Sequence, residues 1–255
     1  MRKDKYTHEY NSKIIKSLPD EINTYMPLSA GVESTAAFIY AINDPEIYPF
    51  CVTWYDPELG DMAEAMLLYV EKMCNFYDVP LVTYSSGGIP TDEIVPIIIS
   101  GLSAWMSTVV GMERFNWKWF MGSGNSEDDI RMRNQFKEYR RILSQHYSDS
   151  LDGHGFSMKA ILKTPEVRYP FEYMSKSELI AFIMQTEPKI YKYLWTCGTP
   201  KAALKDKGEI TGYLPCGKCK KCIEFIGAET RALEAVHRVA TGITYLEKFN
   251  QGFKR

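Results

Sequence analysis

The chain has 255 residues and a mass of 29.3 kDa, which allows one large domain or a domain with a small appendage. It is 45% hydrophobic and 24% charged, close to the globular average, and its aromatic content of 13% argues against disorder. The 30 Lys and Arg nearly balance the 32 Asp and Glu. This balance excludes a strongly polybasic nucleic-acid binder, although a local basic patch remains open.

No part of the sequence favours a membrane protein. The N-terminus is polar and lacks the apolar core of a secretory signal. Residues 94–112 carry no charge and approach the length of a membrane span, but they include Pro96, Gly101, Gly111 and several hydroxyls. We interpret this stretch as a buried core helix and expect a cytoplasmic protein.

Strands and helices alternate along the chain. Apolar runs predict strands over 25–28, 50–55, 81–84 and 117–121, and helical spacing predicts helices over 34–42, 61–76 and 96–112. This alternation predicts a doubly wound, mostly parallel α/β sheet, with ligands at the carboxyl ends of its strands. Further helices are expected over 131–147, after a capping box at Ser175 and Glu178, and over 224–239. We expect a polar extension (1–20), a nucleotide-binding domain (21–190) and a metal-binding helical region (191–255).

The turn after the first predicted strand, residues 28–35 (LSAGVEST), has the composition of an anion site. Small residues let backbone N–H groups point at one spot, the hydroxyls of Ser29, Ser34 and Thr35 add donors, and the following helix adds positive potential. The alternative is that Gly and Ser serve tight geometry alone. The turn is not a Walker A loop, because it has no Gly-Lys-Ser/Thr.

Four of the six cysteines cluster near the C-terminus, at Cys197, Cys216, Cys219 and Cys222. In a chain without a secretory signal this spacing indicates metal ligands rather than disulfides. Four thiolates suit a closed structural zinc site, and an iron–sulfur cluster is the alternative. The other two, Cys51 and Cys74, are expected in the core.

The turn and the cysteines together resemble one family. The turn is similar to the Ser-Gly-Gly-x-Asp-Ser loop of the PP-loop ATP pyrophosphatases, with Ala30 in place of Gly and Glu33 in place of Asp. Trp-x-Cys at 195–197 and Cys-Gly-x-Cys-x-x-Cys at 216–222 resemble the C-terminal pattern of 7-cyano-7-deazaguanine synthase. Segments at 52–56, 122–128 and 170–179 resemble further family segments in the same order, so the resemblance covers residues 22–235.

This resemblance implies a PP-loop fold similar to the adenine nucleotide alpha hydrolases and an ATP-dependent C–N ligase. Such an enzyme converts 7-carboxy-7-deazaguanine to an amide and then to a nitrile, a precursor of queuosine, with ammonia as nitrogen donor. ATP with Mg²⁺ adenylates the oxygen that leaves, zinc is structural, and a homodimer is expected.

The resemblance also implies the roles of particular residues. Catalysis is expected of Ser29, Glu33 and Lys176, and substrate binding of Asn125 and Asp128. Zinc binding is expected of the four clustered cysteines. ATP binding is expected of Leu28, Ser29, Ala30, Gly31, Val32, Glu33, Ser34, Thr35, Thr53, Trp54, Tyr55 and Gly122.

Several of these residues also have plain structural interpretations. Trp54 and Tyr55 either stack on adenine or belong to the core, and Asn125 and Asp128 face substrate or cap the next helix. Lys176 lies in the first turn of a capped helix, where a cation opposes the dipole unless an anion accompanies it. A row of arginines (Arg131, Arg133, Arg140 and Arg141) is expected to form a solvated helix face, with a nucleic-acid or phosphate contact as the alternative.

The chain departs from the family at its chemical end. The family's Arg-Asn pair is absent, since Pro96 is followed by three isoleucines, and its Tyr-Pro-Asp-x-Arg segment is absent as well. Two alternatives therefore stay open: a PP-loop enzyme with another acceptor, such as tRNA, a protein or a different small molecule, and a non-catalytic nucleotide-binding scaffold. A nucleic-acid partner is not favoured.

Overall fold

The computed structural model describes residues 13–14, 17–19, 21–85, 118–120, 122–149 and 167–239. The expected core helix over 96–112 and most of the expected extension over 1–20 lie outside these residues. Among the helices that are described, none is long and apolar enough to cross a bilayer.

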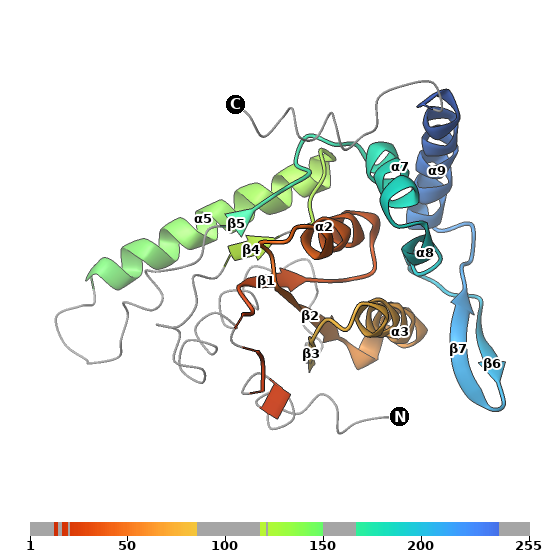
Figure 1. The fold of residues 1–255 in the computed structure, drawn as a ribbon, viewed down its shortest axis with the longest axis horizontal. Helices are drawn as coiled ribbons and strands as arrows, with labels where there is room; N and C mark the ends of the chain where they lie inside the picture. The colour runs from red at the N-terminus through yellow and green to blue at the C-terminus, as the bar shows by residue number, and fades with distance from the viewer. Residues whose placement is uncertain are drawn as a thin grey trace.

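A five-stranded parallel sheet forms the centre of the described structure (Figure 1). Its strands are β1 (Thr24–Pro27), β2 (Pro49–Tyr55), β3 (Leu81–Ser85), β4 (Lys118–Phe120) and β5 (Val167–Arg168). The order β3-β2-β1-β4-β5 confirms the predicted doubly wound α/β fold. The chain moves outward from β1 in one direction and returns to add β4 and β5 on the other side. The switch point of the topology, where such sheets bind ligands, therefore lies between β1 and β4.

Pro27 ends β1 at this switch point. The ladder between β1 and β4 pairs only Thr24 and Tyr25, so it stops before the proline. On the other side the ladder with β2 continues to Pro27, and the N–H of Leu28 donates to the carbonyl of Val52 at 2.8 Å. A proline is tolerated here because the neighbouring ladder that would need its N–H has already ended.

Apart from α8, the described helices lie close to their predicted positions. They are α2 (Val32–Asn43), α3 (Asp61–Phe76), α5 (Glu127–Asp149), α7 (Lys176–Thr186), α8 (Pro188–Tyr191) and α9 (Lys220–Val239), with a 3-10 turn η2 (Pro57–Leu59). The predicted capping box is present, since Ser175 and Glu178 each bond the other's backbone N–H. The last helix begins four residues earlier than expected, inside the cysteine motif.

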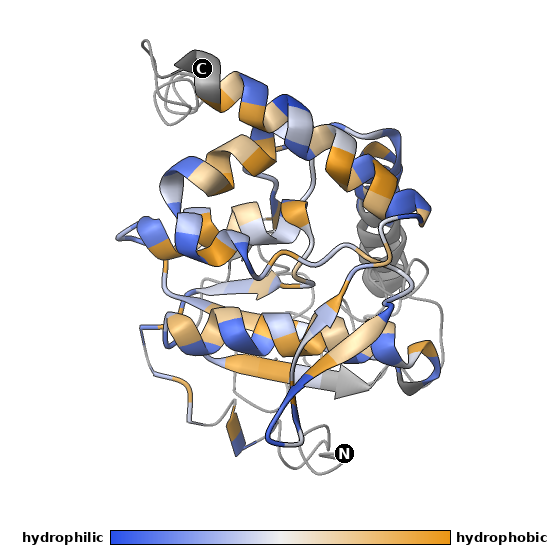
Figure 2. Ribbon diagram, turned by 90° about the vertical axis from the view of Figure 1, so that its right-hand side faces the viewer, coloured by the Kyte–Doolittle hydropathy of each residue, from blue (hydrophilic) through white to orange (hydrophobic). Residues whose placement is uncertain are grey.

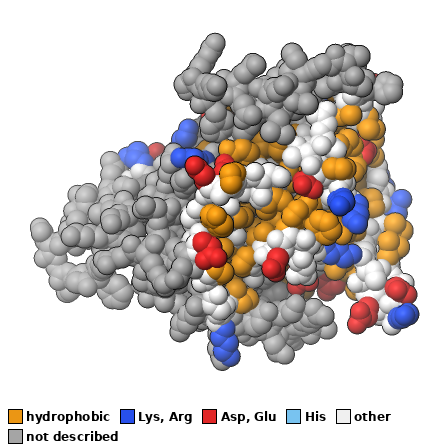
Figure 3. All heavy atoms as spheres, in the orientation of Figure 1, with side chains coloured by type: hydrophobic (Ala, Val, Ile, Leu, Met, Phe, Trp, Pro, Cys, Tyr) orange, Lys and Arg blue, Asp and Glu red, His pale blue; other side chains and the backbone are white. Residues whose placement is uncertain are grey.

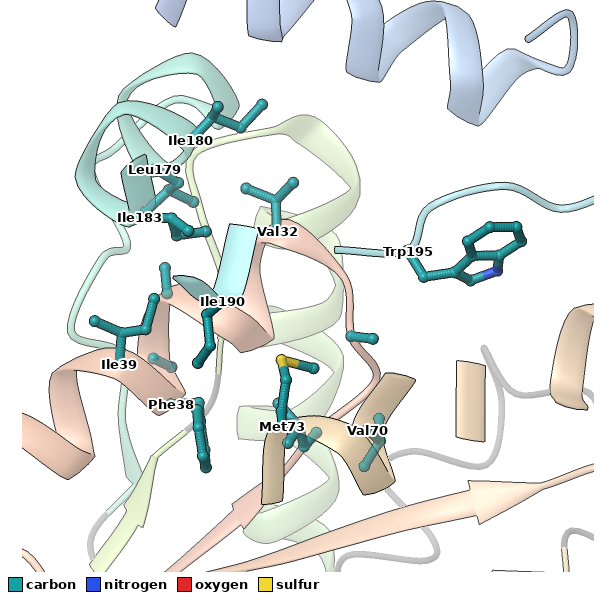
Figure 4. Packing of buried hydrophobic residues seen from close by; sticks show 14 of the residues in the cluster. Val32, Phe38, Ile39, Val70, Met73, Leu179, Ile180, Ile183, Ile190 and Trp195 are labelled. Atoms are coloured by element: carbon teal, nitrogen blue, oxygen red, sulfur yellow. The ribbon is translucent and has the colours of Figure 1, made fainter. Parts of the chain in front are cut away.

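The main core lies where α2 packs against α7 and α3. Figure 4 shows Val32, Phe38 and Ile39 of α2 between side chains of α7, such as Ile183, and Met73 of α3. Helix α7 in turn packs between α2 and α9 (Figure 1). Burial of this apolar face orients α2 and holds its first turn at the end of β1.

A two-stranded antiparallel ribbon, β6 (Ala202–Asp206) and β7 (Glu209–Leu214), follows the first clustered cysteine. Lys207 and Gly208 both have positive φ, as a two-residue hairpin turn requires, and the turn carries hydrophilic residues (Figure 2). The base of the ribbon is attached to α3, because the Tyr69 hydroxyl accepts from the N–H of Tyr213 at 3.1 Å. This ribbon, β5 and α8 were not predicted from the sequence.

Candidate nucleotide and metal sites

The loop between β1 and α2 brings a helix N-terminus to the switch point. Gly31 is the N-cap of α2, and no side chain among the described residues caps the helix there. The first N–H groups of a helix have no partner within it, so the N–H groups of Val32, Glu33 and Ser34 remain available. Together with the helix dipole they form the kind of site that binds phosphate.

Ala30 has a left-handed backbone conformation, with φ 59°. This conformation costs a residue with a Cβ about 1–2 kcal/mol, and glycine escapes the cost. Ala30 therefore adopts a conformation that suits the glycine of the family motif. Its side chain is fully buried, and its carbonyl accepts from the N–H of Trp195 at 2.9 Å.

Two of the three predicted hydroxyl donors lie at the loop. The oxygens of Ser29 and Ser34 are 3.1 Å apart, and Ser34 also donates to the carbonyl of Gly31 at 3.2 Å. The prediction that the Thr35 hydroxyl is a donor at the loop is wrong, because this hydroxyl is buried and donates to the sulfur of Met73 at 3.8 Å. Position 35 lies one helical turn before Ile39 and so belongs to the apolar face of α2. Leu28 and Val32 likewise place their side chains in the core and offer only backbone to a ligand.

Glu33 and Lys176 meet above the first turn of α2. The Nζ of Lys176 lies 3.3 Å from Oε1 of Glu33, with side-chain exposures of 32% and 20%. Lys176 is the first residue of α7, where a cation opposes the helix dipole, and Glu33 supplies the anion that the sequence analysis required. The structure thus joins two predicted catalytic residues that are far apart in the chain.

The loop after β4 is pressed against the same turn. A Cβ on Gly122 would lie 2.4 Å from the carbonyl of Glu33 and from the Cα of Ser34, which is closer than atoms can approach. A Cβ on Gly124 would lie 2.8 Å from the carbonyl of Met174. Both glycines are therefore needed for close backbone packing, and the loop holds α2 and the start of α7 together.

The two predicted substrate residues lie on either side of the start of α5. Asn125 is exposed and tied to the segment before α7, since its N–H donates to the carbonyl of Met174 at 3.0 Å and its amide to that of Tyr173 at 3.3 Å. Asp128 is exposed and pairs with Arg131 at 3.2 Å. The cap is Ser126, whose hydroxyl accepts from the N–H of Asp129. Substrate binding by Asn125 and Asp128 stays a prediction.

The expectation of a fully solvated arginine face is wrong at Arg133. Its side chain is buried and donates to the Ser123 hydroxyl at 2.6 Å and to the Gly124 carbonyl at 2.5 Å. Its guanidinium also lies over the ring of Tyr169. Arg133 therefore fixes the loop after β4. Arg131 and Arg141 pair with acidic neighbours on α5, as a solvated face does, and the side chain of Arg140 lies outside the described part of the chain.

Of the three residues of β2 that were predicted to bind ATP, Thr53 has a buried polar group. Thr53 is fully buried on β2, and its hydroxyl has no hydrogen-bond partner among the described residues. Tyr55 is buried in a small cluster with Ala63 and Leu67, so this residue belongs to the core, the second of its two interpretations. Trp54 is half-buried, so both of its interpretations remain.

The four clustered cysteines meet in space. Their sulfur atoms all lie within 4.8 Å of one another, and those of Cys216 and Cys222 are 3.9 Å apart. Cys197 comes from the segment after α8, Cys216 and Cys219 from the turn after β7, and Cys222 from the start of α9. Gly217 provides the turn with φ 73°. The arrangement has the four ligands of a metal site.

Hydrogen bonds prepare two of these thiols as ligands. The Thr199 hydroxyl, at 3.2 Å, and the backbone N–H of Lys218 lower the pKa of Cys216 to about 5. A backbone hydrogen bond from Gly198 lowers the pKa of Cys219. Burial raises the pKa of Cys222 to about 12, so metal binding must displace a proton there. Cys51 and Cys74 are buried in the core, as expected.

No protein-family model and no curated protein matches the sequence. The structure matches solved chains, among them the U34-tRNA thiolase NcsA from Methanococcus maripaludis with its 4Fe–4S cluster. That match has a TM-score of 0.39 and 13% sequence identity, and covers 92% of this chain and 80% of the thiolase. A similarity this low says nothing about the substrate or metal of this chain.

Proposed function

We propose that this protein is an ATP-using enzyme of the PP-loop type, which adenylates an oxygen of its substrate. The observation that carries the proposal is the meeting of Lys176 and Glu33 at the N-terminus of α2, beside the switch point of the sheet. An ammonium group thus lies near the first N–H groups of a helix, which follow a left-handed loop residue, and such groups suit a polyphosphate.

Each group has a role in this proposal. The N–H groups of Val32, Glu33 and Ser34 and the hydroxyl of Ser29 bind the leaving pyrophosphate. Lys176 moves from Glu33 to a phosphate oxygen and stabilises charge as the bond to the α-phosphorus breaks. Glu33 is then available to a Mg²⁺ ion that the nucleotide brings. The substrate oxygen attacks the α-phosphorus, pyrophosphate leaves, and AMP becomes the leaving group of the next step.

The substrate that we propose is 7-carboxy-7-deazaguanine, with ammonia as the nucleophile that displaces AMP. The amide formed is adenylated in turn and loses AMP to give the nitrile. The order of the motifs in the sequence supports this choice, and a homodimer belongs to the same proposal. A tRNA or protein acceptor and a non-catalytic scaffold are the alternatives. Against a nucleic acid, basic and acidic side chains are interspersed over the described part of the face in Figure 3.

We propose zinc as the metal of the four cysteines. A tetrahedral site with Zn–S bonds of about 2.3 Å separates its sulfurs by about 3.8 Å. The 3.9 Å between Cys216 and Cys222 fits this value. A 4Fe–4S cluster has a separate iron for each thiolate, and a 2Fe–2S cluster has one iron for each pair of thiolates. Both clusters spread the four sulfurs further apart than here, where all four lie within 4.8 Å of one another. Elemental analysis with an absorption spectrum tests the proposal: a colourless protein with one zinc supports it, and a brown protein with iron and sulfide contradicts it.

The test of the activity is one incubation with labelled ATP, Mg²⁺, ammonium and 7-carboxy-7-deazaguanine, read for AMP and by mass spectrometry. AMP with an amide or nitrile supports the proposed substrate, and AMP without them supports another acceptor. Folded, metal-loaded protein that binds ATP without forming AMP supports the scaffold. Lys176→Gln should reduce AMP formation about 10- to 100-fold, whereas Lys189→Gln, an exposed lysine on α8, should not change it.

A further inference from the structure

The left-handed conformation of Ala30 needs support from outside the loop. A residue with a Cβ keeps a positive φ only when its surroundings determine it. Ala30 is fully buried at φ 59°, so its methyl group cannot move aside into solvent. The hydrogen bond that its carbonyl accepts, 2.9 Å from the N–H of Trp195, joins the loop to a segment far along the chain.

Trp195 is itself fixed from two sides. Its indole stacks on Tyr69 of α3, with ring centroids 5.3 Å apart and planes inclined by 21°, and it is nearly fully buried. Two residues later comes Cys197, whose sulfur accepts from the N–H of Cys216 at 3.2 Å. The donor to Ala30 is therefore placed by the stacking on α3 and by the four-cysteine site.

We propose that the metal centre sets the nucleotide affinity of the loop between β1 and α2, which we call the nucleotide loop. The backbone N–H of Trp195 is the positioning group between the two sites. A metal holds four sulfurs together that would otherwise separate, and its binding free energy stabilises the segment 195–197. That segment in turn keeps the carbonyl of Ala30 turned toward Trp195, and so keeps the following N–H groups aimed at the phosphates. This inference rests on the proposed nucleotide binding.

Coupling of this kind is reciprocal. If the metal raises the affinity for nucleotide by some factor, nucleotide raises the affinity for metal by the same factor. Couplings between sites are commonly in the range of about 5- to 150-fold, and a single shared hydrogen bond that is lost outright corresponds to about tenfold. We therefore expect metal to raise the nucleotide affinity about tenfold and nucleotide to raise the metal affinity about tenfold.

The first experiment compares zinc-loaded and zinc-depleted protein. Binding of the non-hydrolysable α,β-methylene analogue of ATP, with Mg²⁺, is measured by calorimetry, and circular dichroism checks the fold. We expect about tenfold weaker binding after depletion. Equal binding by folded depleted protein overturns the inference and leaves the proposed function intact. No binding by loaded protein overturns the proposed function, a separate outcome.

Two variants separate the hydrogen bond from the ring. Trp195→Pro and Trp195→Ala both remove the indole that stacks on Tyr69, but only Trp195→Pro also removes the backbone N–H. With zinc content equal to that of the wild type, the proline variant should bind the analogue about tenfold more weakly than the alanine variant. A loaded, folded proline variant with wild-type affinity overturns the inference.

A third measurement uses only wild-type protein, so it tests the coupling even if the zinc-depleted protein or the variants unfold. The zinc affinity of the wild type is determined by competition with a zinc-selective chromophoric chelator, with and without saturating analogue. Tighter zinc binding in the presence of analogue supports the coupling. An unchanged zinc affinity, with the analogue shown to be bound, contradicts it.

Discussion

The four-cysteine site and the proposed nucleotide loop differ in the groups that form them. At the cysteines, four side chains of one type converge, and the local sequence already contains three of them within one turn and the start of α9. At the loop, the useful groups are backbone N–H groups, and their positions depend on Trp195, on Gly122 and on the packing of α7. A site made of side chains is lost by changing one ligand, whereas a site made of backbone is lost by disturbing its distant supports.

The largest effect should come from removing one ligand of the metal. Cys222→Ser should abolish stoichiometric binding of the proposed zinc and lower the free energy of unfolding by about 4 kcal/mol or more, because metal binding is part of folding. Zinc content and urea unfolding measure both. The control is Cys74→Ala, a buried thiol outside the cluster, which should keep its zinc. Full zinc occupancy in the serine variant would show that Cys222 is not a ligand.

The second effect tests the support of the loop. Gly122→Ala places a methyl 2.4 Å from the backbone of Glu33, and the resulting displacement should cost about 1–3 kcal/mol of stability and reduce ATP affinity. Gly198→Ala is the matched control, because a Cβ there meets nothing within 4 Å. Unfolding and ATP titration of the two variants give the comparison. Equal stability and affinity would mean that the loop after β4 does not support α2.

The third prediction concerns alkaline pH. Tyr77, Tyr191 and Tyr213 each donate to a glutamate, and burial followed by these hydrogen bonds raises the pKa of each phenol above its usual 10. A raised pKa stabilises the fold fully below pH 10, and this contribution is lost as the pH rises toward the folded-state pKa. The urea midpoint should therefore fall between pH 9 and pH 11.5.

Tyr213→Phe sharpens this prediction, because Tyr213 joins β7 to Glu64 of α3. The variant should be less stable at pH 8 and lose less stability on going to pH 11. Its exposed counterpart Tyr48→Phe lies outside the ribbon and should leave the slope of the wild type nearly unchanged. A slope that is the same in Tyr213→Phe as in the wild type would remove Tyr213 from the explanation.

The smallest effect belongs to the loop itself. Ala30→Gly relieves a left-handed alanine, worth about 1–2 kcal/mol, but gives the unfolded chain more freedom, worth about 0.5–1 kcal/mol. The net gain in unfolding free energy should be about 0.5–1 kcal/mol, measured by urea unfolding. Ala37→Gly, in the middle of α2, is the control and should be destabilising. A destabilised Ala30→Gly would mean that the buried methyl contributes more than the strain costs.

The sequence predicted the parts of the molecule that depend on local pattern. Strand and helix alternation predicted the sheet, the spacing of the cysteines predicted their convergence, and the capping box predicted the start of α7. The polar contacts of Arg133 could not be predicted, because its partners Ser123 and Gly124 come from the preceding loop and not from its own helix. The meeting of Glu33 with Lys176 depends on how α2 and α7 pack. The strand β5 is two residues long, too short for any periodicity.

The hydrogen bond between Trp195 and Ala30 also has a consequence for synthesis on the ribosome. Strand β1 and helix α2 leave the exit tunnel early, but the donor to Ala30 emerges only after most of the chain has been made, and the cysteines follow it. The loop therefore lacks this hydrogen bond through most of translation. If the proposed coupling holds, a nascent chain should reach its full nucleotide affinity only after residue 222 has emerged and metal has been acquired, so a shorter chain competes less well for ATP.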